Sequence, residues 1–410
     1  MSAIPRSILA IDAGAATTSV AILGRVGDRW RLLGSLAAPS PAEPDAVATI
    51  LARRVRAADQ GLADAVDLDA RRIDDLPRLE ARSAAPTTLA VLGASRRTVG
   101  LLSAIAERTS WRMVAASPES HDPREMTDLA MRPEVAAVLV GIGEPAGPDE
   151  RAAIDDVAGL VGAVARRRPE LRVVLAGPVA SRRAWIDAIG EAPGAAAASE
   201  VEGTKGPVAQ GIASPERTFE APALGPRSGP DEALREILEG LLPRGSDPRH
   251  TALRTLVSLA DVLDRRVELL EIGFDGGLRG VAQPGVADEG PVVEGVRSAR
   301  AGLVPPDPDE ATVEAVLEWT TGSLDRHRMG DRLRDLRSQP WADSAGDGAR
   351  LRLAAARAAL TRLVEVTPDL SARPPADLTL VAGGAFAAAP GGAIALAVAD
   401  VVRRTGATQV

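Results

Sequence analysis

The stretch IDAGAATTSVAIL, residues 11–23, has the pattern of a β-strand end, a tight turn and a second β-strand. The apolar run SILAI leads into it and RWRLLGSLAA follows, so residues 7–37 are predicted to form an antiparallel meander of three strands. Asp12 and Gly14 stand in the first turn. Both an ordinary hairpin turn and a phosphate-binding turn use these residue types, and the residues alone leave the two interpretations open.

The same strand, glycine-bearing turn and strand return at residues 267–285, as VELLEIG, FDGG and LRGVAQPG. A further apolar strand, DLTLVAGG, ends at Gly383 and Gly384, where backbone can approach a ligand closely. Two such hairpins and a double glycine are what a nucleotide held between two related domains requires. The sequence therefore predicts a cleft with one turn on each side.

Composition excludes several classes of function. The chain has 410 residues, 45% of them hydrophobic and 25% charged, which is typical of a folded protein with more than one domain. A net charge of −8 without a basic stripe argues against nucleic-acid binding, and no long uncharged apolar segment predicts a membrane span. We therefore expect a cytoplasmic protein.

Metal chemistry based on sulfur or histidine is not expected. The chain contains no cysteine, which removes disulfides, thiolate catalysis and sulfur-ligated metals. Its three histidines, His121, His250 and His327, are far apart in the sequence and are interpreted as surface residues.

The middle of the chain has a different pattern from its ends. Between residues 88 and 190, short apolar strands alternate with amphipathic helices, which predicts a parallel sheet covered on both faces. Residues 191–230 are rich in Ala, Pro, Gly and Ser and are predicted to be an irregular connection. We expect an N-terminal α/β domain at 1–247 and a C-terminal α/β domain at 248–410, with the last helix, 391–404, packing back on the first domain.

Five motifs carry a resemblance to a known family. The segments are Asp12 to Ser19 (similar to DIGSTxTK), Glu271 to Arg279 (DIGGATTDV), VVEGVRSAR with Val293, Glu294, Gly295 and Arg300 (TVEGDLGxR), Gly383 to Pro390 (GGVFAHAP) and Thr405, Gly406, Thr408 and Gln409 (TGxTQ). The chain resembles the MutL family, the ATPase-like reactivating partners of the adenosylcobalamin-dependent glutamate mutase, within the actin-like ATPase superfamily. The resemblance implies a two-domain, ribonuclease H-like α/β fold with mixed sheets and an inter-domain cleft.

The resemblance also implies ligands, partners and site residues. The expected cofactor is ATP or ADP with Mg²⁺, none of it covalently bound, and Asp12 is the expected metal-binding residue. The expected partners are an adenosylcobalamin-dependent mutase and a second copy of the chain. The residues assigned to the nucleotide are Gly14, Thr17 and Thr18 in the first turn, Glu271 and Gly273 in the second, and Gly383 and Gly384 beside the adenosine.

Several motif positions depart from the family pattern. Ala15 and Ala16 lack two hydroxyl groups, Ser19 replaces a lysine, and Glu271 and Leu278 replace aspartates. Both threonines of the second motif are glycine. The mid-chain segment VLVGIGEPAG, residues 138–147, has also lost the polar glycine-rich loop that the family has there. Each hydrogen bond to a charged phosphate contributes about 1.5–3 kcal/mol, so these losses predict weakened nucleotide binding and weakened hydrolysis.

Three functions are therefore compatible with the residues. The first is an ATP-dependent reactivating factor, or chaperone-like partner, of a cobalamin mutase. The second is a degenerate pseudo-ATPase that acts as a non-catalytic protein-binding scaffold. The third, a small-molecule kinase of the same superfamily, lacks a convincing second aspartate motif. Glu294 and Arg300 are interpreted as either an ion pair that holds the fold or a partner surface, the first being favoured.

Overall fold

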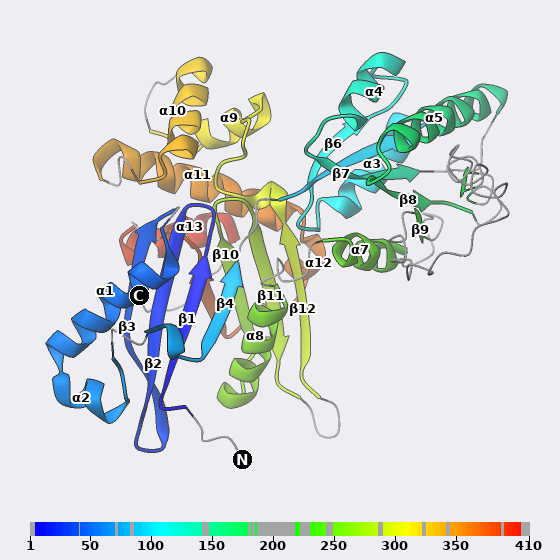
Figure 1. Ribbon diagram of the computed structural model, residues 1–410. Helices are drawn as coiled ribbons and strands as arrows, with labels where there is room; N and C mark the ends of the chain where they lie inside the picture. Colours follow the sequence, from blue (N-terminus) through cyan, green and yellow to red (C-terminus); the bar gives the residue numbers. More distant parts are fainter. Residues whose placement is uncertain are drawn as a thin grey trace, which may run out of the picture. The chain divides into compact units, whose positions relative to one another are not determined.

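The chain forms two compact units in a computed structural model (Figure 1). Unit 1 combines residues Met1–Ala85 with Pro243–Val410, and unit 2 is the segment Pro86–Leu242 between them. The first 85 residues thus group with the C-terminal part, because their hairpin packs on residues that come late in the chain. This grouping differs from the domain boundary at 247 that we expected from the sequence. The structure describes residues 5–40, 42–69, 73–82, 86–141, 147–178, 182, 185–186, 218–221, 230–242, 249–285, 290–321, 325–341, 345–386 and 389–402.

The first sheet of unit 1 contains the predicted meander. Its strands are β1 (Ser7–Ala13), β2 (Thr17–Val26), β3 (Arg29–Pro39) and β4 (Arg78–Arg82), in the order β3-β2-β1-β4. The meander is antiparallel, and β4 lies parallel to β1. Alternate residues of β2 are buried because helix α1 (Pro44–Ala58) covers one face of the sheet, where Val47 and Leu51 join the same core as Ile22. The short elements α2 (Gln60–Ala65) and η1 (Ile73–Asp75) lead to β4.

The second sheet of unit 1 repeats this topology. Its strands are β10 (Val267–Ile272), β11 (Gly277–Gln283), β12 (Val292–Ser298) and β13 (Leu378–Ala382), in the order β12-β11-β10-β13. Again the three consecutive strands are antiparallel and the fourth is parallel to the first. The predicted α/β class with mixed sheets is confirmed, and the two hairpins belong to separate sheets.

Helices cover the second sheet and build the largest core. Helix α8 (Arg249–Leu263) lies against β11 and β12, and η2 (Ala299–Ala301) follows β12. Helix α11 (Gly346–Glu365) packs with α9 (Glu310–Leu317), α10 (Arg326–Ser338) and α13 (Gly391–Val402) around apolar residues that include Ile272 of β10. The predicted last helix is therefore present, but it packs on α11 of the C-terminal part, where the expected contact was with the N-terminal domain. The TGxTQ segment lies outside the described residues.

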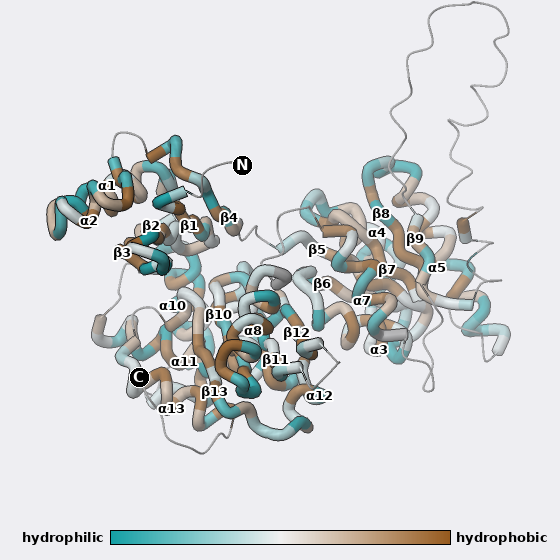
Figure 2. Tube along the Cα trace, turned by 90° about the horizontal axis from the view of Figure 1, so that it is seen from below, coloured by the Kyte–Doolittle hydropathy of each residue, from teal (hydrophilic) through white to brown (hydrophobic). Residues whose placement is uncertain are grey.

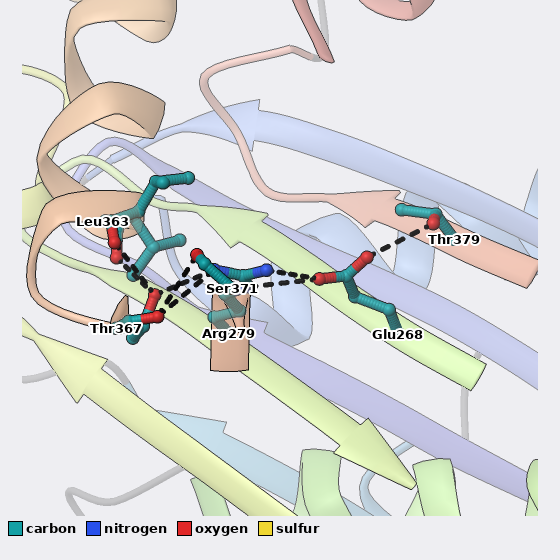
Figure 3. A network of polar contacts seen from close by, with 7 residues as sticks. Glu268, Arg279, Leu363, Thr367, Ser371 and Thr379 are labelled. Atoms are coloured by element: carbon teal, nitrogen blue, oxygen red, sulfur yellow. Dashed lines mark hydrogen bonds and ion pairs between the residues drawn. The ribbon is translucent and has the colours of Figure 1, made fainter. Parts of the chain in front are cut away.

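A buried ion pair joins the second sheet to the end of α11 (Figure 3). Glu268 of β10 and Arg279 of β11 are at most 1% exposed, and Arg279 Nη2 lies 2.9 Å from Glu268 Oε1. Arg279 also donates hydrogen bonds to the hydroxyls of Thr367 and Ser371, the latter in α12 (Pro368–Ser371), while Thr379 of β13 donates to Glu268. These further hydrogen bonds satisfy both charges, which is the condition under which the attraction within a buried pair offsets its desolvation cost.

Unit 2 is the predicted parallel sheet. Its strands are β5 (Thr88–Gly93), β6 (Arg112–Ala116), β7 (Val135–Gly141), β8 (Arg172–Ala176) and β9 (Thr218–Ala221), in the order β6-β5-β7-β8-β9 and all parallel. Helices α3 (Arg96–Ala106) and α7 (Pro230–Gly240) share one core with the sheet, and α4 (Pro123–Ala130) and α5 (Pro148–Arg167) share the other. The hydrophobic strands run through the middle of this unit in Figure 2.

Strand β9 lies inside the segment predicted to be an irregular connection. Only four residues, TFEA, pair with β8, so neither alternation nor an apolar run marks them in the sequence. The remainder of 191–230 lies almost entirely outside the described residues, as does most of the 138–147 loop beyond β7. None of the helices in the described ranges combines the length and the apolar character that crossing a membrane would need.

Candidate functional site

The two hairpin turns of unit 1 have the same backbone geometry. In the first, the N–H of Gly14 donates to the carbonyl oxygen of Thr17 at 2.7 Å, and in the second the N–H of Gly273 donates to that of Gly276 at 2.8 Å. The strand pairing agrees as well, because Asp12 lies opposite Ser19 and Glu271 lies opposite Leu278. Asp12 and Glu271 are therefore equivalent residues at the ends of equivalent strands.

Both turns and the double glycine line one pocket. Its lining includes Asp12, Thr17, Glu271, Arg297, Arg352 and Gly384, all of which belong to unit 1. The volume open to the centres of water molecules is about 80 Å³. Since one buried water needs roughly 10–15 Å³ by this measure, the space admits several waters or a compact polyatomic ion. A pocket between the two turns is therefore present, and it lies within unit 1, whereas the prediction was a cleft between two domains.

The two carboxyl groups share one positive charge. Burial raises the pKa of Glu271, the nearby charge of Arg297 lowers it in part, and the negative charge of Asp12 raises it further. Partial burial also raises the pKa of Asp12, again with a partial lowering by Arg297, although Asp12 is an exposed residue. Arg297 thus lies within electrostatic reach of both strand-end carboxylates.

Strand register explains how Arg297 reaches this position. Arg297 of β12 lies opposite Leu278 of β11, which in turn lies opposite Glu271 of β10. Residues directly opposite one another in antiparallel strands project from the same face, so Arg297 and Glu271 share a face of the sheet. We did not predict this residue, although a signal was present: Arg297 stands where the motif TVEGDLGxR has leucine.

The nearby charge of Arg297 disfavours a magnesium ion between the two strand-end carboxyl groups. Mg²⁺ prefers an octahedron of oxygen ligands, usually one or two carboxylates with waters and phosphate oxygens. Here the positive charge of Arg297 acts on both strand-end carboxyl groups, and the third acidic residue of the lining, Asp275, forms an ion pair with Arg337 of α10. Within the described ranges, no three His, Asp or Glu side chains gather into a set that could hold a metal.

The threonines of the first turn have different surroundings. Thr17 lines the pocket, and its hydroxyl oxygen would lie 3.9 Å from a Cβ atom built on Gly14. Thr18 is 3% exposed, does not line the pocket, and donates its hydroxyl hydrogen bond to the carbonyl oxygen of Ala42. Of the two, only Thr17 is placed to meet a ligand, and the phosphate role predicted for Thr18 has no support in this geometry.

The second turn is filled by the protein itself. Phe274 is 8% exposed, belongs to the core around α11, and carries the Arg337 guanidinium 4.9 Å from its ring centre. Arg337 also donates to the carbonyl oxygen of Val304 at 2.9 Å. Phe274 and Asp275, which replace small residues of the family motif, therefore bind this turn to Arg337 of α10. The turn has less freedom to close around a phosphate chain as a result.

Gly383 and Gly384 differ in what they contact. Gly383 has φ +105°, and a Cβ atom built there would lie 2.1 Å from the carbonyl oxygen of Ile272. Close approach to β10 thus explains Gly383 without a ligand. For Gly384 the nearest atom to such a Cβ is the Thr17 hydroxyl oxygen, 3.8 Å away across the pocket. The adenosine role of both residues stays a prediction.

The motif residues Glu294 and Arg300 are not partners. Glu294 forms an ion pair with Arg373, and Arg300 lies 3.8 Å from Glu365. The expected ion pair between them is wrong, because Glu294 lies within β12 whereas Arg300 belongs to η2, which turns toward the end of α11.

Arg352 is the second residue of the site that the sequence did not reveal. It lies on α11, is 2% exposed, and stacks 4.6 Å from the ring centre of Trp341. The Trp341 indole in turn donates a 3.0 Å hydrogen bond to the carbonyl oxygen of Ala16 in the first turn. Arg352 belongs to the pocket lining, and its Nε and Nη2 are buried without a hydrogen-bond partner among the described residues. Burial lowers the pKa of Arg352.

Comparison with known proteins gives only distant similarities. No protein-family model matches the chain, and neither does any curated protein sequence. Among solved structures, a nucleotide-free acetone carboxylase matches with 11% identity over 89% of this chain and 62% of its own, at a TM-score of 0.26. A PilM–PilN type IV pilus biogenesis complex matches with 14% identity over 97% of this chain and 86% of its own, at the same TM-score. At such TM-scores neither similarity bears on the site.

Proposed function

We propose that this chain is a non-hydrolysing, protein-binding relative of the actin-like ATPases. The observation that supports it best is the position of Arg297, which faces Asp12 and Glu271 where an ATPase would hold its metal ion. The repeated sheets and turns keep the geometry of a nucleotide site. Among the described residues, the two carboxylates that would hold the cation for phosphoryl transfer are opposed by the charge of Arg297.

The energetics favour a scaffold over an ATPase. Phosphoryl transfer depends almost entirely on positioned charge, with metal ions that neutralise the phosphates and a group that orients the attacking water. In this pocket both strand-end carboxylates interact with Arg297, and Asp275 interacts with Arg337. Since none of them faces the pocket without a nearby guanidinium, we expect neither a bound metal nor an activated water.

The partner is proposed from the sequence resemblance. The motifs at Gly383 to Pro390 and Val293 to Arg300 are similar to those of the reactivating partners of adenosylcobalamin-dependent glutamate mutase. We accordingly propose a cobalamin-dependent mutase as the client, and a second copy of the chain as a further partner. In a protein that does not hydrolyse ATP, client binding would depend on the surface of the folded units rather than on a nucleotide cycle.

One experiment tests both parts of this proposal. Purified chain is incubated with an adenosylcobalamin-dependent glutamate mutase that has been inactivated by turnover, with Mg-ATP, with Mg-ADP or without nucleotide. Phosphate release, complex formation and recovery of mutase activity are measured in the same samples. We expect a complex without nucleotide and no phosphate release above the protein-free sample. Sustained Mg-ATP hydrolysis by the purified chain would contradict the proposal.

An ATP-driven reactivating factor is the second candidate. The observation in its favour is that both turns line the same pocket, as a nucleotide between two lobes requires. It predicts that mutase activity recovers only with Mg-ATP, whereas the scaffold predicts no such requirement. A small-molecule kinase ranks last, because a carboxylate that accepts a proton from a hydroxyl group has to be available, and both strand-end carboxylates interact with Arg297.

A further inference from the structure

The first sheet of unit 1 has one apolar face that is open to water. Of the helices in the described ranges, α1 is the one that packs extensively on β1, β2 and β3, and it lies on the other face, where Leu9 and Ile22 are fully buried. Leu32 is 62% exposed and Leu79 is 59% exposed. Strand pairing places two rows of side chains on this open face, namely Ile8, Leu23 and Leu32, and then Leu79, Ala21 and Ser35.

The second sheet shows what covers the equivalent face. Because Asp12 corresponds to Glu271, the strand registers relate the residues of the two sheets one by one. Leu23, Leu32 and Leu79 correspond to Ala282, Val293 and Leu380. The latter three share one core with Leu256 and Ala260 of α8, which lies across β11 in Figure 1. The same face of the repeat therefore holds a helix in the second sheet and none of the described helices in the first.

The open face also has the shape that a helix needs. In the second sheet, Leu253 of α8 lies directly over Gly280 and Gly295, because a Cβ atom built on these glycines would lie 2.7 and 2.5 Å from its Cδ2 atom. The corresponding residues of the first sheet are Ala21 and Ser35, which are small as well. Small residues beside larger apolar ones allow the backbone of a helix to approach the sheet while its apolar side chains are buried.

One end of the open face is positive. The N–H of Arg25 donates to the carbonyl oxygen of Arg6, so these two arginines are neighbours where β1 begins, and Trp30 lies opposite Arg25 in β3. Asp28 offsets part of this charge, at 3.6 Å from Arg25. Asp12 stands at the other end of the face. A partner with acidic side chains over the arginines and an apolar surface beside them complements this pattern.

The orientation of α8 indicates which end of such a helix carries the acidic residues. Residues 264–266 connect the end of α8 to the start of β10, so the helix ends at the edge of the sheet that corresponds to Arg6 and Arg25. Asp261 and Asp264 are exposed at this end of α8. A helix placed in the same way on the first sheet would bring its C-terminal residues to the arginines.

We propose that the open face of the first sheet is the docking site for an amphipathic helix of a partner protein, with its apolar side on Leu23, Leu32 and Leu79 and acidic residues near its C-terminal end beside Arg6 and Arg25. The proposal deepens the proposed function by naming the surface that binds the partner, and it rests on that function only for the existence of a protein partner. Recognition of this kind depends on apolar anchors at helical spacing.

Binding is tested on the intact chain with a helical peptide of this chain's own residues 249–264. The peptide is locked as a helix by a staple on its solvent side and carries a fluorophore. A matched peptide has Asp261→Asn and Asp264→Asn. Fluorescence anisotropy is expected to show saturable binding of the first peptide, at least about threefold tighter than that of the second at low salt. Absence of binding, or equal affinity of the two peptides, would overturn the inference.

Leu32→Asp and Leu79→Asp locate the bound peptide. Each is expected to weaken binding by at least about tenfold, because a charge replaces a buried apolar contact. Both residues are exposed in the free chain, so the variants are expected to fold, which urea unfolding verifies. Ile50→Asp is the matched control, since Ile50 is 46% exposed on α1, on the other side of the sheet. Equal affinities of Leu32→Asp and Ile50→Asp would overturn the inference.

Arg25→Gln tests the positive end. It is expected to reduce the advantage of the acidic peptide over its matched form to less than about twofold, whereas Arg54→Gln, at an exposed residue of α1, is expected to leave the advantage unchanged. An unchanged advantage in Arg25→Gln would overturn the assignment of the acidic residues to this end.

Two further measurements separate the possible occupants. If sedimentation shows that the natural chain self-associates and that Leu32→Asp does not, a second copy covers the face and the proposed occupant is wrong. In the mutase experiment, Leu32→Asp is expected to weaken the complex and Ile50→Asp is not. A complex that both variants leave intact would overturn the inference and leave the proposed function standing. Sustained Mg-ATP hydrolysis would instead contradict the proposed function, so the two failures are distinguishable.

Discussion

Gly14 and Gly273 occupy the same place in two copies of one turn. Each donates its N–H to the carbonyl oxygen three residues later, at 2.7 and 2.8 Å, and each follows a strand-end carboxylate by two residues. The copies differ in their side chains, because Ala15 in the first corresponds to Phe274 in the second. One turn therefore keeps a small, open surface, whereas the other is fastened to the core by an aromatic ring.

The glycines after β13 give the first prediction. Gly383→Ala is expected to lower the free energy of unfolding by about 1–3 kcal/mol, because alanine is strained in this backbone conformation. The loss is expected to be larger still, because the new methyl group would clash with the Ile272 carbonyl oxygen and β10 would have to move. Urea unfolding measures the difference. Gly384→Ala is the neighbouring control, since its new methyl group would meet nothing closer than 3.8 Å, and equal losses in both variants would refute this explanation.

The buried ion pair gives the second prediction. Arg279→Met leaves Glu268 buried without its partner, so the free energy of unfolding is expected to fall by about 3–5 kcal/mol. The double variant with Glu268→Gln is expected to recover part of this loss. Arg326→Gln serves as the control, because Arg326 pairs with Glu310 at the surface, where such pairs contribute less than about 1 kcal/mol. Similar losses for Arg279→Met and Arg326→Gln would show that burial of the pair is not the cause.

The raised pKa of Glu271 gives a prediction with a defined pH dependence. A carboxyl group whose pKa is raised on folding above its ordinary value of 4.5 supports the folded state below that pH and loses this support as the pH rises through the folded value. Glu271→Gln cannot ionise, so it is expected to be more stable than the natural chain at neutral pH. The difference should disappear below pH 4.5.

Urea unfolding at several pH values measures this difference. Glu310→Gln, which removes a carboxylate from the exposed side of α9, is the control for the loss of one negative charge. If Glu271→Gln is instead less stable at neutral pH, the attraction of Arg297 outweighs burial, and the ionised form is the one that the fold favours.

The indole of Trp341 gives the fourth prediction. Its hydrogen bond to the Ala16 carbonyl oxygen anchors the first turn to the segment before α11. Trp341→Phe removes the hydrogen-bond donor and keeps an aromatic ring under Arg352. The free energy of unfolding is expected to fall by about 0.5–1.5 kcal/mol. The lower end of this range is expected, because the Ser40 N–H still donates to the Ala16 carbonyl oxygen. Thermal unfolding is the measurement. Trp30→Phe, at a residue 42% exposed, is expected to change stability by less.

Local patterns predicted much of the fold. The meander at 7–37, its second copy at 267–285 and the parallel strands of unit 2 all followed from apolar runs and glycine-bearing turns. Strand β9 was missed because four residues show no period, and the grouping of the first 85 residues with the C-terminal part was missed because it depends on contacts between distant segments.

The candidate site was predicted only in part. Asp12, Gly14, Thr17, Glu271, Gly273 and both late glycines do line one pocket, whereas Thr18 does not. Arg297 and Arg352 were absent from the prediction. Arg297 could have been noticed, because it stands where the family motif has leucine. Arg352 could not, because an arginine within a helix has no pattern that separates a ligand-binding side chain from a surface one.

The sequence by itself determined the two hairpins, their glycine turns and the α/β class, since these depend on residues close together in the chain. Only the tertiary structure decided which charges meet between the turns. Arg297 reaches Glu271 through the register of three strands, and Arg352 reaches the pocket through the packing of α11 on Trp341. Register and packing fix the position of a side chain in space, and that position determines whether two carboxylates hold a metal ion or face an arginine.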